Sequence, residues 1–281
     1  MSTPFLPSSK KNMASSFSQL LTRQYQNHDI LSRRKKFHHL EQPFINLQDE
    51  IFARLNKERS YIMLDVGCGN GDLIIDLAEK GIKGTFFGID QSGGMVAAAQ
   101  SAASEKNIPF TATVDRAEAL PFHDNTFDVV ITKYALHCIE DISAALKEIY
   151  RVLKPGGQFL VITRSERSQV NFDALLHELS QKFGLSLVPN LWRRCTIEMV
   201  PGLTPQFSHH TVSFLESTIR VTDIAPFRDY LDTYRTYFDP NPSDELWQKI
   251  LDEGCARVQK MIDENGVYEQ PVAHGICICH K

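Results

Sequence analysis

Short runs of β-branched and apolar residues alternate with stretches of helical spacing through the middle of the chain. The expected strands span residues 61–66, 85–90, 110–114, 127–132 and 158–163, and the helices between them span about 71–80, 93–106 and 141–153. Strands that alternate with helices at this spacing indicate βαβ units and a mostly parallel sheet. The pattern therefore predicts an α/β fold in which helices cover the faces of one sheet.

The segments that flank this alternation predict a tail, a cap and an elaborated main domain. Residues 1–13 are poor in apolar side chains and predict a disordered tail, whereas residues 14–58 predict an N-terminal helical cap. The main domain then spans 59–281. A Pro-containing insertion at about 185–207 is interpreted as a lid or wall of a substrate pocket, because long irregular loops in compact domains tend to be functional. The remaining expected elements are helices at about 171–183, 224–237 and 243–265 and strands at 211–221 and 272–279.

Charge and cysteine content exclude several classes of function. The net charge is −4, and the only dense basic run, residues 33–36, fits a solvated helix face, so no nucleic-acid partner is expected. No apolar stretch approaches the roughly 18 residues of a membrane helix, and no membrane partner is expected. The six cysteines form no C-x-x-C pair, so the sequence favours reduced thiols, no metal site and a cytoplasmic location. It is compatible with a monomer or a homodimer.

A glycine-rich turn follows the first expected strand and is the strongest functional signal. The segment Leu64–Asp72 reads LDVGCGNGD, and glycines in such a turn let the backbone approach a ligand that a Cβ atom would keep away. The second strand ends in Asp90, whose carboxylate would lie beside the same crevice. A carboxylate there can accept a hydrogen bond from each of the two hydroxyls of a ribose. Such charge-assisted hydrogen bonds are worth about 1.5 to 3 kcal/mol each.

A dinucleotide-binding dehydrogenase also combines a glycine-rich turn with an acidic second strand. Its fingerprint is G-x-G-x-x-G/A, but the glycines here fall as G-x-G-x-G and Asp72 occupies the last position. A carboxylate at that point would repel a pyrophosphate. S-adenosylmethionine carries no phosphate, and Asp65 is a suitable counter-charge for its amino group or sulfonium. Electrostatics therefore favours the sulfonium cofactor.

Four segments resemble class I S-adenosylmethionine-dependent methyltransferases, specifically the type-11 group related to the C-methyltransferases of ubiquinone and menaquinone biosynthesis. The segments are LDVGCGNGDL (64–73), GIDQSGGMV (88–96), AEALPFHDNTFDVV (117–130) and ALKEIYRVLKPGGQFLV (145–161). The resemblance is strong over about 60–165 and loose over 211–279. It implies a Rossmann-like three-layer sandwich whose seven-stranded, mostly parallel sheet has the order 3-2-1-4-5-7-6, with the helical cap in front of it.

The resemblance also implies the roles of individual residues. Asp65, Gly67 and Gly69 would line the methionine moiety, and Asp90 would bind the ribose. The adenine would lie against residues 115–117, where the family usually has an aspartate immediately before the Ala-Glu pair; this chain has Arg116 there, preceded by Asp115 and followed by Ala117. The expected cofactor-contacting set is completed by Tyr25, Cys68, Gln91, Met95 and Lys133.

The segment after the fourth strand, residues 132–138, should border the transferred methyl group. In-line positioning can contribute roughly 7 to 11 kcal/mol to a displacement, so a base is optional. His137 is the candidate base, and a histidine packed beneath the loop is the alternative. The (N/D)-P-P-(Y/F) tetrapeptide of many N-methyltransferases is missing here, which favours an oxygen or carbon acceptor on a small molecule.

A set of later residues could wall an aromatic pocket or fill a core, namely Trp192, Arg193, Arg194, Phe207, Phe214, Phe227, Tyr230, Tyr234, Tyr237 and Phe238. Two other functions stay open from the sequence alone. One is a nicotinamide-dependent oxidoreductase, which Asp72 disfavours. The other is a protein that binds S-adenosylmethionine without transferring its methyl group.

Overall fold

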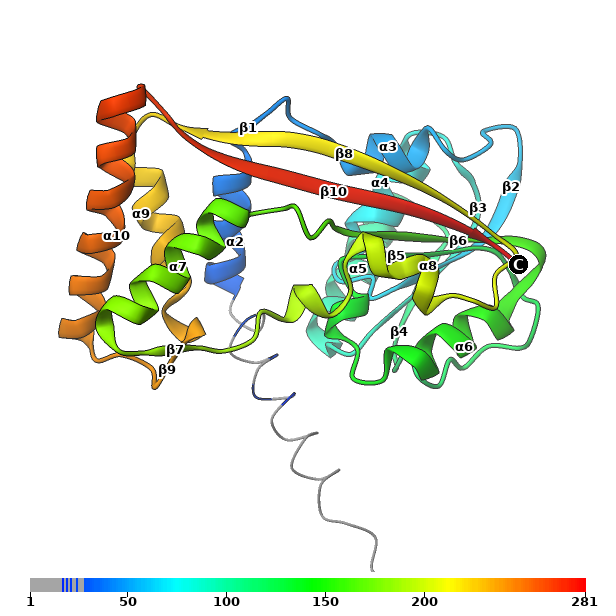
Figure 1. The fold of residues 1–281 in the computed structure, drawn as a ribbon. Coiled ribbons are helices and arrows are strands. Elements are labelled where there is room, and N and C mark those ends of the chain that lie inside the picture. The colour runs from blue at the N-terminus through cyan, green and yellow to red at the C-terminus, as the bar shows by residue number, and fades with distance from the viewer. Residues whose placement is uncertain (1–16, 18, 20, 22–23, 25–27) are drawn as a thin grey trace, which may run out of the picture. The chain divides into compact units, whose positions relative to one another are not determined.

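The computed structural model describes residues 17, 19, 21, 24 and 28–281 (Figure 1). Contacts divide the chain into two compact units. The helical unit contains residues up to 44, 169–191 and 217–272, and the sheet unit contains residues 45–168, 192–216 and 273–281. Each unit is therefore assembled from three separate segments of the chain. The tail expected at 1–13 and the candidate Tyr25 lie outside the described residues.

The described part of the chain alternates strands with helices as the sequence predicts. Its longer strands are β2 (Ser60–Val66), β3 (Lys83–Asp90), β4 (Phe110–Val114), β5 (Phe127–Lys133), β6 (Leu153–Arg164), β8 (His209–Val221) and β10 (Tyr268–His280). Its α-helices are α2 (His28–His38), α3 (Leu47–Phe52), α4 (Asp72–Glu79), α5 (Gly93–Glu105), α6 (Ile142–Val152), α7 (Val170–Phe183), α8 (Val200–Leu203), α9 (Ile224–Asp232) and α10 (Asp244–Asn265). Shorter elements are β1 (Glu41–Gln42), β7 (Ser186–Leu187), β9 (Phe238–Asp239), η1 (Leu136–Cys138), η2 (Leu191–Arg194), η3 (Ile197–Met199) and η4 (Arg235–Tyr237).

The central sheet has the order β1-β8-β10-β6-β5-β2-β3-β4. Read from β4 and without the two-residue β1, this is the predicted 3-2-1-4-5-7-6, so the fold prediction is confirmed and one short strand is added. Strands β2 to β6 are parallel to one another, and β10 runs antiparallel to β6. Two small strands, β7 and β9, form a separate antiparallel pair.

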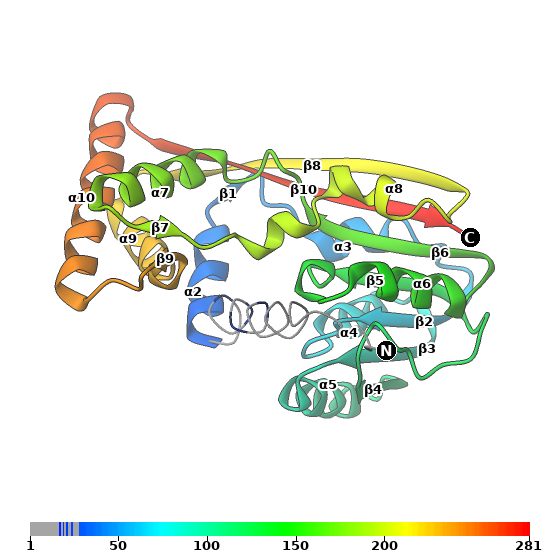
Figure 2. The ribbon, with the colours of Figure 1, turned by 60° about the horizontal axis from the view of Figure 1, so that its bottom comes forward.

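Alternation of side chains along the strands produces the layers of the sheet unit (Figure 2). Met63, Val129 and Leu160 pack in one core cluster with residues of α4 and α5. The neighbouring residues Leu64, Val130 and Phe159 pack in the opposite cluster with residues of α6. Because successive side chains of a strand point to opposite faces, one sheet supplies both cores and the unit is a three-layer sandwich.

Two regions differ from the predicted boundaries for identifiable reasons. Strand β6 begins at Leu153 rather than at residue 158, because Leu153 already pairs with Phe127 before the register shifts and Val129 pairs with Gln158. The Pro-Gly-Gly sequence lies within this irregularity, with Gly156 at a φ of 76°. The insertion at 185–207 contains short elements, and its residues Cys195, Ile197 and Val200 are fully buried in the α6-side cluster.

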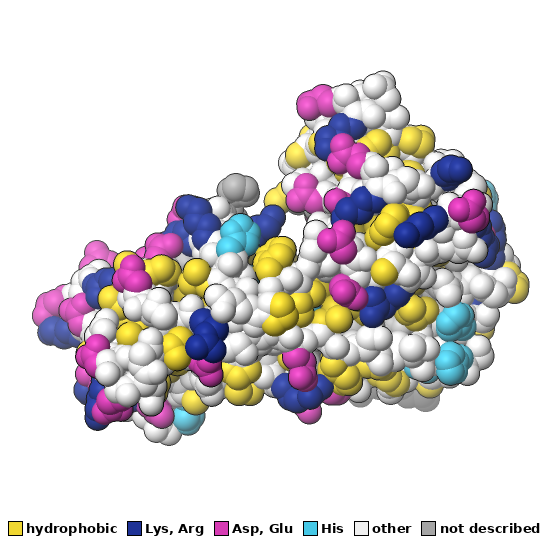
Figure 3. Space-filling model, turned by 90° about the horizontal axis from the view of Figure 1, so that it is seen from above, with side chains coloured by type: hydrophobic (Ala, Val, Ile, Leu, Met, Phe, Trp, Pro, Cys, Tyr) yellow, Lys and Arg dark blue, Asp and Glu magenta, His cyan; other side chains and the backbone are white. Residues whose placement is uncertain are grey.

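The surface carries both signs of charge. On the face in Figure 3, acidic and basic side chains are interspersed. In the helical unit, Arg33 from the basic run donates to the carboxylates of Asp229 and Asp232, each at 2.8 Å, and Arg34 lies over the ring of Tyr234. Among the described residues, no helix is both long and apolar enough to cross a membrane.

Candidate functional site

The candidate site lies at the carboxyl ends of β2, β3 and β5, within the sheet unit. The chain leaves β2 toward β3 and β4 on one side and returns to β5 and β6 on the other, so the strand order reverses between β2 and β5. Open α/β sheets bind ligands at such a switch point. The parallel register sets Asp65 of β2 opposite Ile131 of β5, which brings the turn after β2 beside the segment after β5.

The glycine loop, residues 67–71, needs glycine for two different reasons. Gly67 has a φ of 79°, and a Cβ atom on it would lie 2.4 Å from the Cβ of Ala135, so the two segments touch there. Gly69 has a φ of 53°, but a Cβ atom on it would meet nothing within 4 Å. The amides of Gly67 and Cys68 both donate to the carbonyl of Ile89, at 2.8 and 2.9 Å. The loop is therefore tied to β3 while the position of Gly69 opens into free space.

Asp90, the last residue of β3, holds the loop through its carboxylate. One oxygen, Oδ2, accepts from the Gly69 amide at 3.0 Å, and Oδ1 accepts from the Ser92 amide at 2.9 Å. A carboxylate offers about four acceptor positions, so two further donors can bind to Asp90. Ser92 also begins α5, where its hydroxyl accepts from the Met95 amide.

Asp65 is a buried acid with unused acceptor capacity. Its side chain is on β2 and the residue is 2% exposed, and Oδ1 has no hydrogen-bond partner among the described residues. Burial raises the pKa of Asp65 to about 7; the positive charge of Lys133 opposes this rise and the carboxylate of Asp90 adds to it. A buried carboxyl without a donor is costly, and a bound cation would relieve that cost.

The segment expected to contact adenine follows β4. The Asp115 amide donates to the carbonyl of Asp90 at 3.2 Å, which holds this segment beside the end of β3. The side chain of Arg116 is 58% exposed and pairs with Glu118 at 3.0 Å and Glu140 at 3.6 Å. Ala117 is buried. The guanidinium of Arg116 is thus neutralised by its neighbours.

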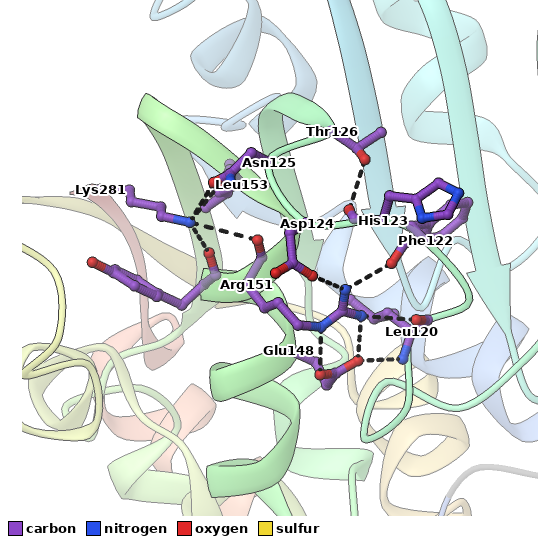
Figure 4. A network of polar contacts seen from close by, with 11 residues as sticks. Leu120, Phe122, His123, Asp124, Asn125, Thr126, Glu148, Arg151, Leu153 and Lys281 are labelled. Carbon is purple, nitrogen blue, oxygen red and sulfur yellow. Dashed lines mark hydrogen bonds and ion pairs between the residues drawn. The ribbon is translucent and has the colours of Figure 1, made fainter.

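A polar network fixes the loop between this segment and β5 (Figure 4). Arg151 of α6 donates to the carbonyls of Leu120 and Phe122, and to the carboxylates of Asp124 and Glu148, all at 2.7 to 3.0 Å. Oε2 of Glu148, which accepts from Nη2 of Arg151, also accepts from the Leu120 amide at 2.9 Å. The bond from Arg151 holds the pKa of Glu148 below its usual range. These five residues are called the Arg151 network below. Through Glu148 and Arg151, the KEIYRV segment (147–152) holds the loop in front of β5.

The segment after β5 contributes Tyr134 to a residue pair that the sequence analysis missed. Tyr134 has a φ of 57°, which costs a non-glycine residue about 1 to 2 kcal/mol. Its amide donates to the carbonyl of Ile162, and its hydroxyl lies 2.6 Å from Nδ1 of His274 on β10. Nothing in the sequence signals this pair, because 140 residues separate its members.

His137 lies in η1 and is 4% exposed. Burial lowers its pKa to about 3, and the positive charges of Arg164 and Arg194 contribute to the shift. Its carbonyl accepts from Arg194 at 2.9 Å. The structure therefore favours the packed interpretation of this histidine.

The remaining sequence candidates separate into crevice and core. Cys68 is buried in the glycine loop, Met95 and Lys133 are half-buried, and Gln91 is exposed. Most of the aromatic set is buried core, whereas Phe214 is 42% exposed beneath the guanidinium of Arg167. The buried residues are Phe227, Tyr230, Tyr234, Tyr237 and Phe238 in the helical unit and Trp192 and Phe207 in the sheet unit.

A separate cavity of about 560 Å³ lies in the helical unit. Its lining includes Asn171 and Glu178 of α7, Arg257 of α10 and Tyr268 of β10. Glu178 and Arg257 form an ion pair at 2.6 Å. None of the residues selected from the sequence lines this cavity.

Comparison with known proteins decides the family. A model described as a methyltransferase domain matches residues 57–206, which is more than half of the chain. The chain belongs to this methyltransferase family. The resemblance in the sequence implies S-adenosylmethionine as the cofactor of this domain.

Curated relatives include enzymes that methylate different molecules. The chain is 36% identical over 130 residues to a demethylmenaquinone methyltransferase of Anoxybacillus flavithermus, covering 46% of this chain and 55% of the relative. It is 31% identical over 176 residues to one of Lactiplantibacillus plantarum, covering 61% and 68%. A sterol 4-C-methyltransferase of Caenorhabditis elegans is 29% identical over 171 residues, covering 57% and 48%. The chain spans about half the length of the first of these relatives.

Solved structures share the fold at low identity. The YcgJ protein of Bacillus subtilis superposes with a TM-score of 0.57 at 19% identity, covering 83% of this chain and 97% of that one. The [4+2]-cyclase SpnF superposes with a TM-score of 0.51 at 21% identity, covering 84% and 80%. The second likeness shows that this fold alone does not fix the reaction.

The described residues fit the cofactor that the family uses. S-adenosylmethionine carries an ammonium group, and the buried Oδ1 of Asp65 is an acceptor without a donor. Its ribose carries two hydroxyl donors, and the carboxylate of Asp90 has acceptor capacity left beyond its two backbone bonds. The open space at Gly69 leaves room for a ligand against the backbone of the loop.

Proposed function

We propose that this enzyme transfers the methyl group of S-adenosylmethionine to an oxygen or carbon atom of a small molecule that bears an acidic hydroxyl. When bound, the cofactor supplies a methyl group on a positively charged sulfur, which is a good leaving group. The observation that carries the proposal is the buried carboxyl of Asp65, which has an unused oxygen and lies beside a loop that Asp90 holds open.

In this proposal different residues of the crevice bind different parts of the cofactor. Asp65 binds the methionine amino group, and the backbone of Gly67 to Gly69 lies against the methionine chain. Asp90 accepts from the ribose hydroxyls, and residues 115–117 lie along the adenine. Cys68, Gln91, Met95 and Lys133 complete the wall. Because Arg116 is held by Glu118 and Glu140, we assign the reading of the adenine edge to Asp115 and the backbone of Ala117.

The choice of an oxygen or carbon acceptor rests on two supports. The segment after β5 reads Thr-Lys-Tyr-Ala and lacks the tetrapeptide of many N-methyltransferases. The relatives named for demethylmenaquinone and for sterol 4-C-methylation act on ring systems with oxygen substituents, and the second name specifies carbon. A cytoplasmic location, which the six free thiols support, is part of the same proposal.

Calorimetry with S-adenosylhomocysteine tests the cofactor assignment. The wild-type protein should bind it, and Asp90→Ala should weaken binding by about 10- to 100-fold, because a charge-assisted hydrogen bond is worth about 1.5 to 3 kcal/mol. Asp76→Ala is a matched control, since Asp76 is on α4 and pairs with Lys80. Equal affinities of wild type and Asp90→Ala would contradict the assignment.

The acceptor class is tested by release of S-adenosylhomocysteine from a small panel. The panel contains 1,4-dihydroxynaphthalene, 4-nitrocatechol and, as a nitrogen acceptor, 2-aminonaphthalene. We expect turnover with at least one hydroxyl compound and none with the amine. Turnover of the amine alone would overturn the acceptor proposal, and tight cofactor binding with no turnover of any hydroxyl compound would favour a reaction without methyl transfer, as the likeness to a cyclase illustrates.

A further inference from the structure

Tyr134, the residue that follows β5, and His274 on β10 form a short polar contact between two titratable side chains. The tyrosine hydroxyl lies 2.6 Å from Nδ1 of the imidazole, and His274 is 6% exposed. Their rings also meet edge to face, with centroids 6.0 Å apart. Both residues belong to the sheet unit, so the pair is defined within one compact body.

The backbone places Tyr134 beside the loop assigned to the cofactor. Tyr134 directly follows the last residue of β5, and the next residue, Ala135, touches Gly67. The positive φ of Tyr134 is uncommon for a residue with a bulky side chain, and such backbone outliers cluster at active sites. The carbonyl of Ile162 on β6 holds this conformation through the Tyr134 amide.

We propose that Tyr134 accepts the proton of the acceptor hydroxyl during methyl transfer and passes its own phenolic proton to Nδ1 of His274. Tyr134 is then the catalytic residue, and His274 is a positioning residue that also receives the charge. This inference rests on the proposed function, because it requires an acceptor that carries a hydroxyl. It replaces His137, which is buried among positive charges, as the proton acceptor of the site.

The proton transfer balances without any further reactant. The acceptor O–H bond breaks as its proton bonds to the Tyr134 oxygen, and the Tyr134 O–H bond breaks as that proton bonds to Nδ1. The electron pair left on the acceptor oxygen forms the bond to the methyl carbon, directly or through a ring carbon as the oxygen becomes a carbonyl. The electrons of the broken carbon–sulfur bond stay on sulfur, and His274 ends as an imidazolium.

Charged groups on neighbouring strands enter the pH dependence of this step, including Glu216 of β8, which pairs with Arg167 at 2.7 Å. Asp65 on β2 and Lys133 on β5 belong to the crevice, and Arg164 on β6 is the register partner of His274. Arg194 and His137 lie on the segments that pack against the end of β5. Because the pKa of Asp65 is raised, this residue can contribute an acid limb to the rate, and variants must separate its effect from that of His274.

The test measures methyl transfer to 1,4-dihydroxynaphthalene, whose hydroxyls are protonated at pH 7.5, and to 4-nitrocatechol, which is already ionised. Tyr134→Phe should lower kcat for the first acceptor by about 100-fold, within the usual range for a general base, with KM changed less than threefold. For the second acceptor the loss should be less than fivefold, because no proton needs to be removed. Tyr150→Phe is the matched control, since Tyr150 lies on α6 against Phe207.

His274→Gln separates positioning from proton acceptance, because a glutamine oxygen can still accept the bond from Tyr134. We expect a loss of about tenfold with 1,4-dihydroxynaphthalene and a changed pH profile of kcat, while the acid limb due to Asp65 remains. His280→Gln, further along β10, is the control. Equal losses on both acceptors in Tyr134→Phe, or an unchanged pH profile in His274→Gln, would overturn the inference and leave methyl transfer intact.

An NMR measurement that does not depend on turnover completes the test. In the protein loaded with S-adenosylhomocysteine, the ¹⁵N resonance of His274 Nδ1 should be that of an unprotonated hydrogen-bond acceptor and should shift in Tyr134→Phe. A protonated Nδ1 at pH 7.5 would sink the inference whatever the rates are. If wild type turns over neither hydroxyl compound, the proposed function fails first and this inference fails with it.

Discussion

The cofactor crevice and the Arg151 network lie in the same unit, but their carboxylates differ in hydrogen bonding and in the direction in which folding shifts their pKa. Glu148 accepts from the Arg151 guanidinium and from a backbone amide, and its pKa is lowered. Asp65 is more deeply buried, has an oxygen without a donor, and its pKa is raised to about 7. The network stabilises the fold around it, whereas the crevice keeps an interaction unsatisfied until a ligand supplies it. A buried carboxyl with an unsatisfied oxygen, such as Asp65, therefore identifies the site better than a dense set of polar contacts such as the Arg151 network.

The largest expected difference between the two regions is the change in the free energy of unfolding when the charge of Asp65 is removed. Its pKa is about 7 in the folded protein against 3.8 for an ordinary aspartate, so above pH 7 folding bears the full cost of a buried charge. Asp65→Asn should raise the free energy of unfolding of the ligand-free protein by up to about 4 kcal/mol at pH 8. The gain should shrink as pH falls from 7 and vanish near pH 4. Urea denaturation at several pH values measures it, and a loss of stability at pH 8 would contradict the raised pKa.

The matching change in the network should have the opposite sign. Glu148→Gln removes a charge that the Arg151 guanidinium stabilises, and should lower the free energy of unfolding by about 2 kcal/mol at pH 8. Because the pKa of Glu148 is lowered by folding, its contribution is present above the ordinary glutamate pKa and is lost as pH falls through the folded value. The same urea series run on this variant checks it. Stabilisation by Glu148→Gln would remove the contrast between the regions.

Ligand affinity should follow the protonation of Asp65. If the carboxylate binds the cofactor ammonium, the affinity for S-adenosylhomocysteine should fall by about tenfold, or about 1.4 kcal/mol, from pH 8 to pH 6. Binding at pH 6 should release close to one proton, which calorimetry in buffers of different ionisation enthalpy detects. Asp65→Asn should bind weakly and lose both effects. A pH-independent affinity in wild type would show that Asp65 does not meet the ligand as an anion.

The smallest expected effect concerns two glycines at positive φ with free space around them. Gly69→Ala and Gly266→Ala should each cost about 1 kcal/mol of stability, since a Cβ at either position meets nothing within 4 Å and only the backbone conformation is strained. Only Gly69→Ala should also weaken binding of S-adenosylhomocysteine, because the ligand approaches that part of the loop. Thermal denaturation and calorimetry on both variants test this. Equal affinities would remove the loop from the site.

The sequence was sufficient for the parts of the molecule that local patterns determine. Periodicity predicted most of the long helices and strands, and the resemblance of four segments to class I methyltransferases implied the strand order and the family. Contacts between distant segments could not be predicted from the sequence. Tyr134 contacts His274, 140 positions away, and nothing in the local sequence indicates the positive φ of Tyr134. The sequence left open whether His137 is a base or a packed histidine, because its burial depends on how η1 packs near Arg194.

Each compact unit is assembled from three stretches of chain that alternate along the sequence. The sheet unit includes residues 273–281, so a ribosome must synthesise the chain as far as β10 before that unit can close its sheet through this strand. No single cut in the gene can separate the two bodies. Folding during synthesis must therefore protect the edge of β6 until β10 has been made, because pairing between strands far apart in the sequence is slow.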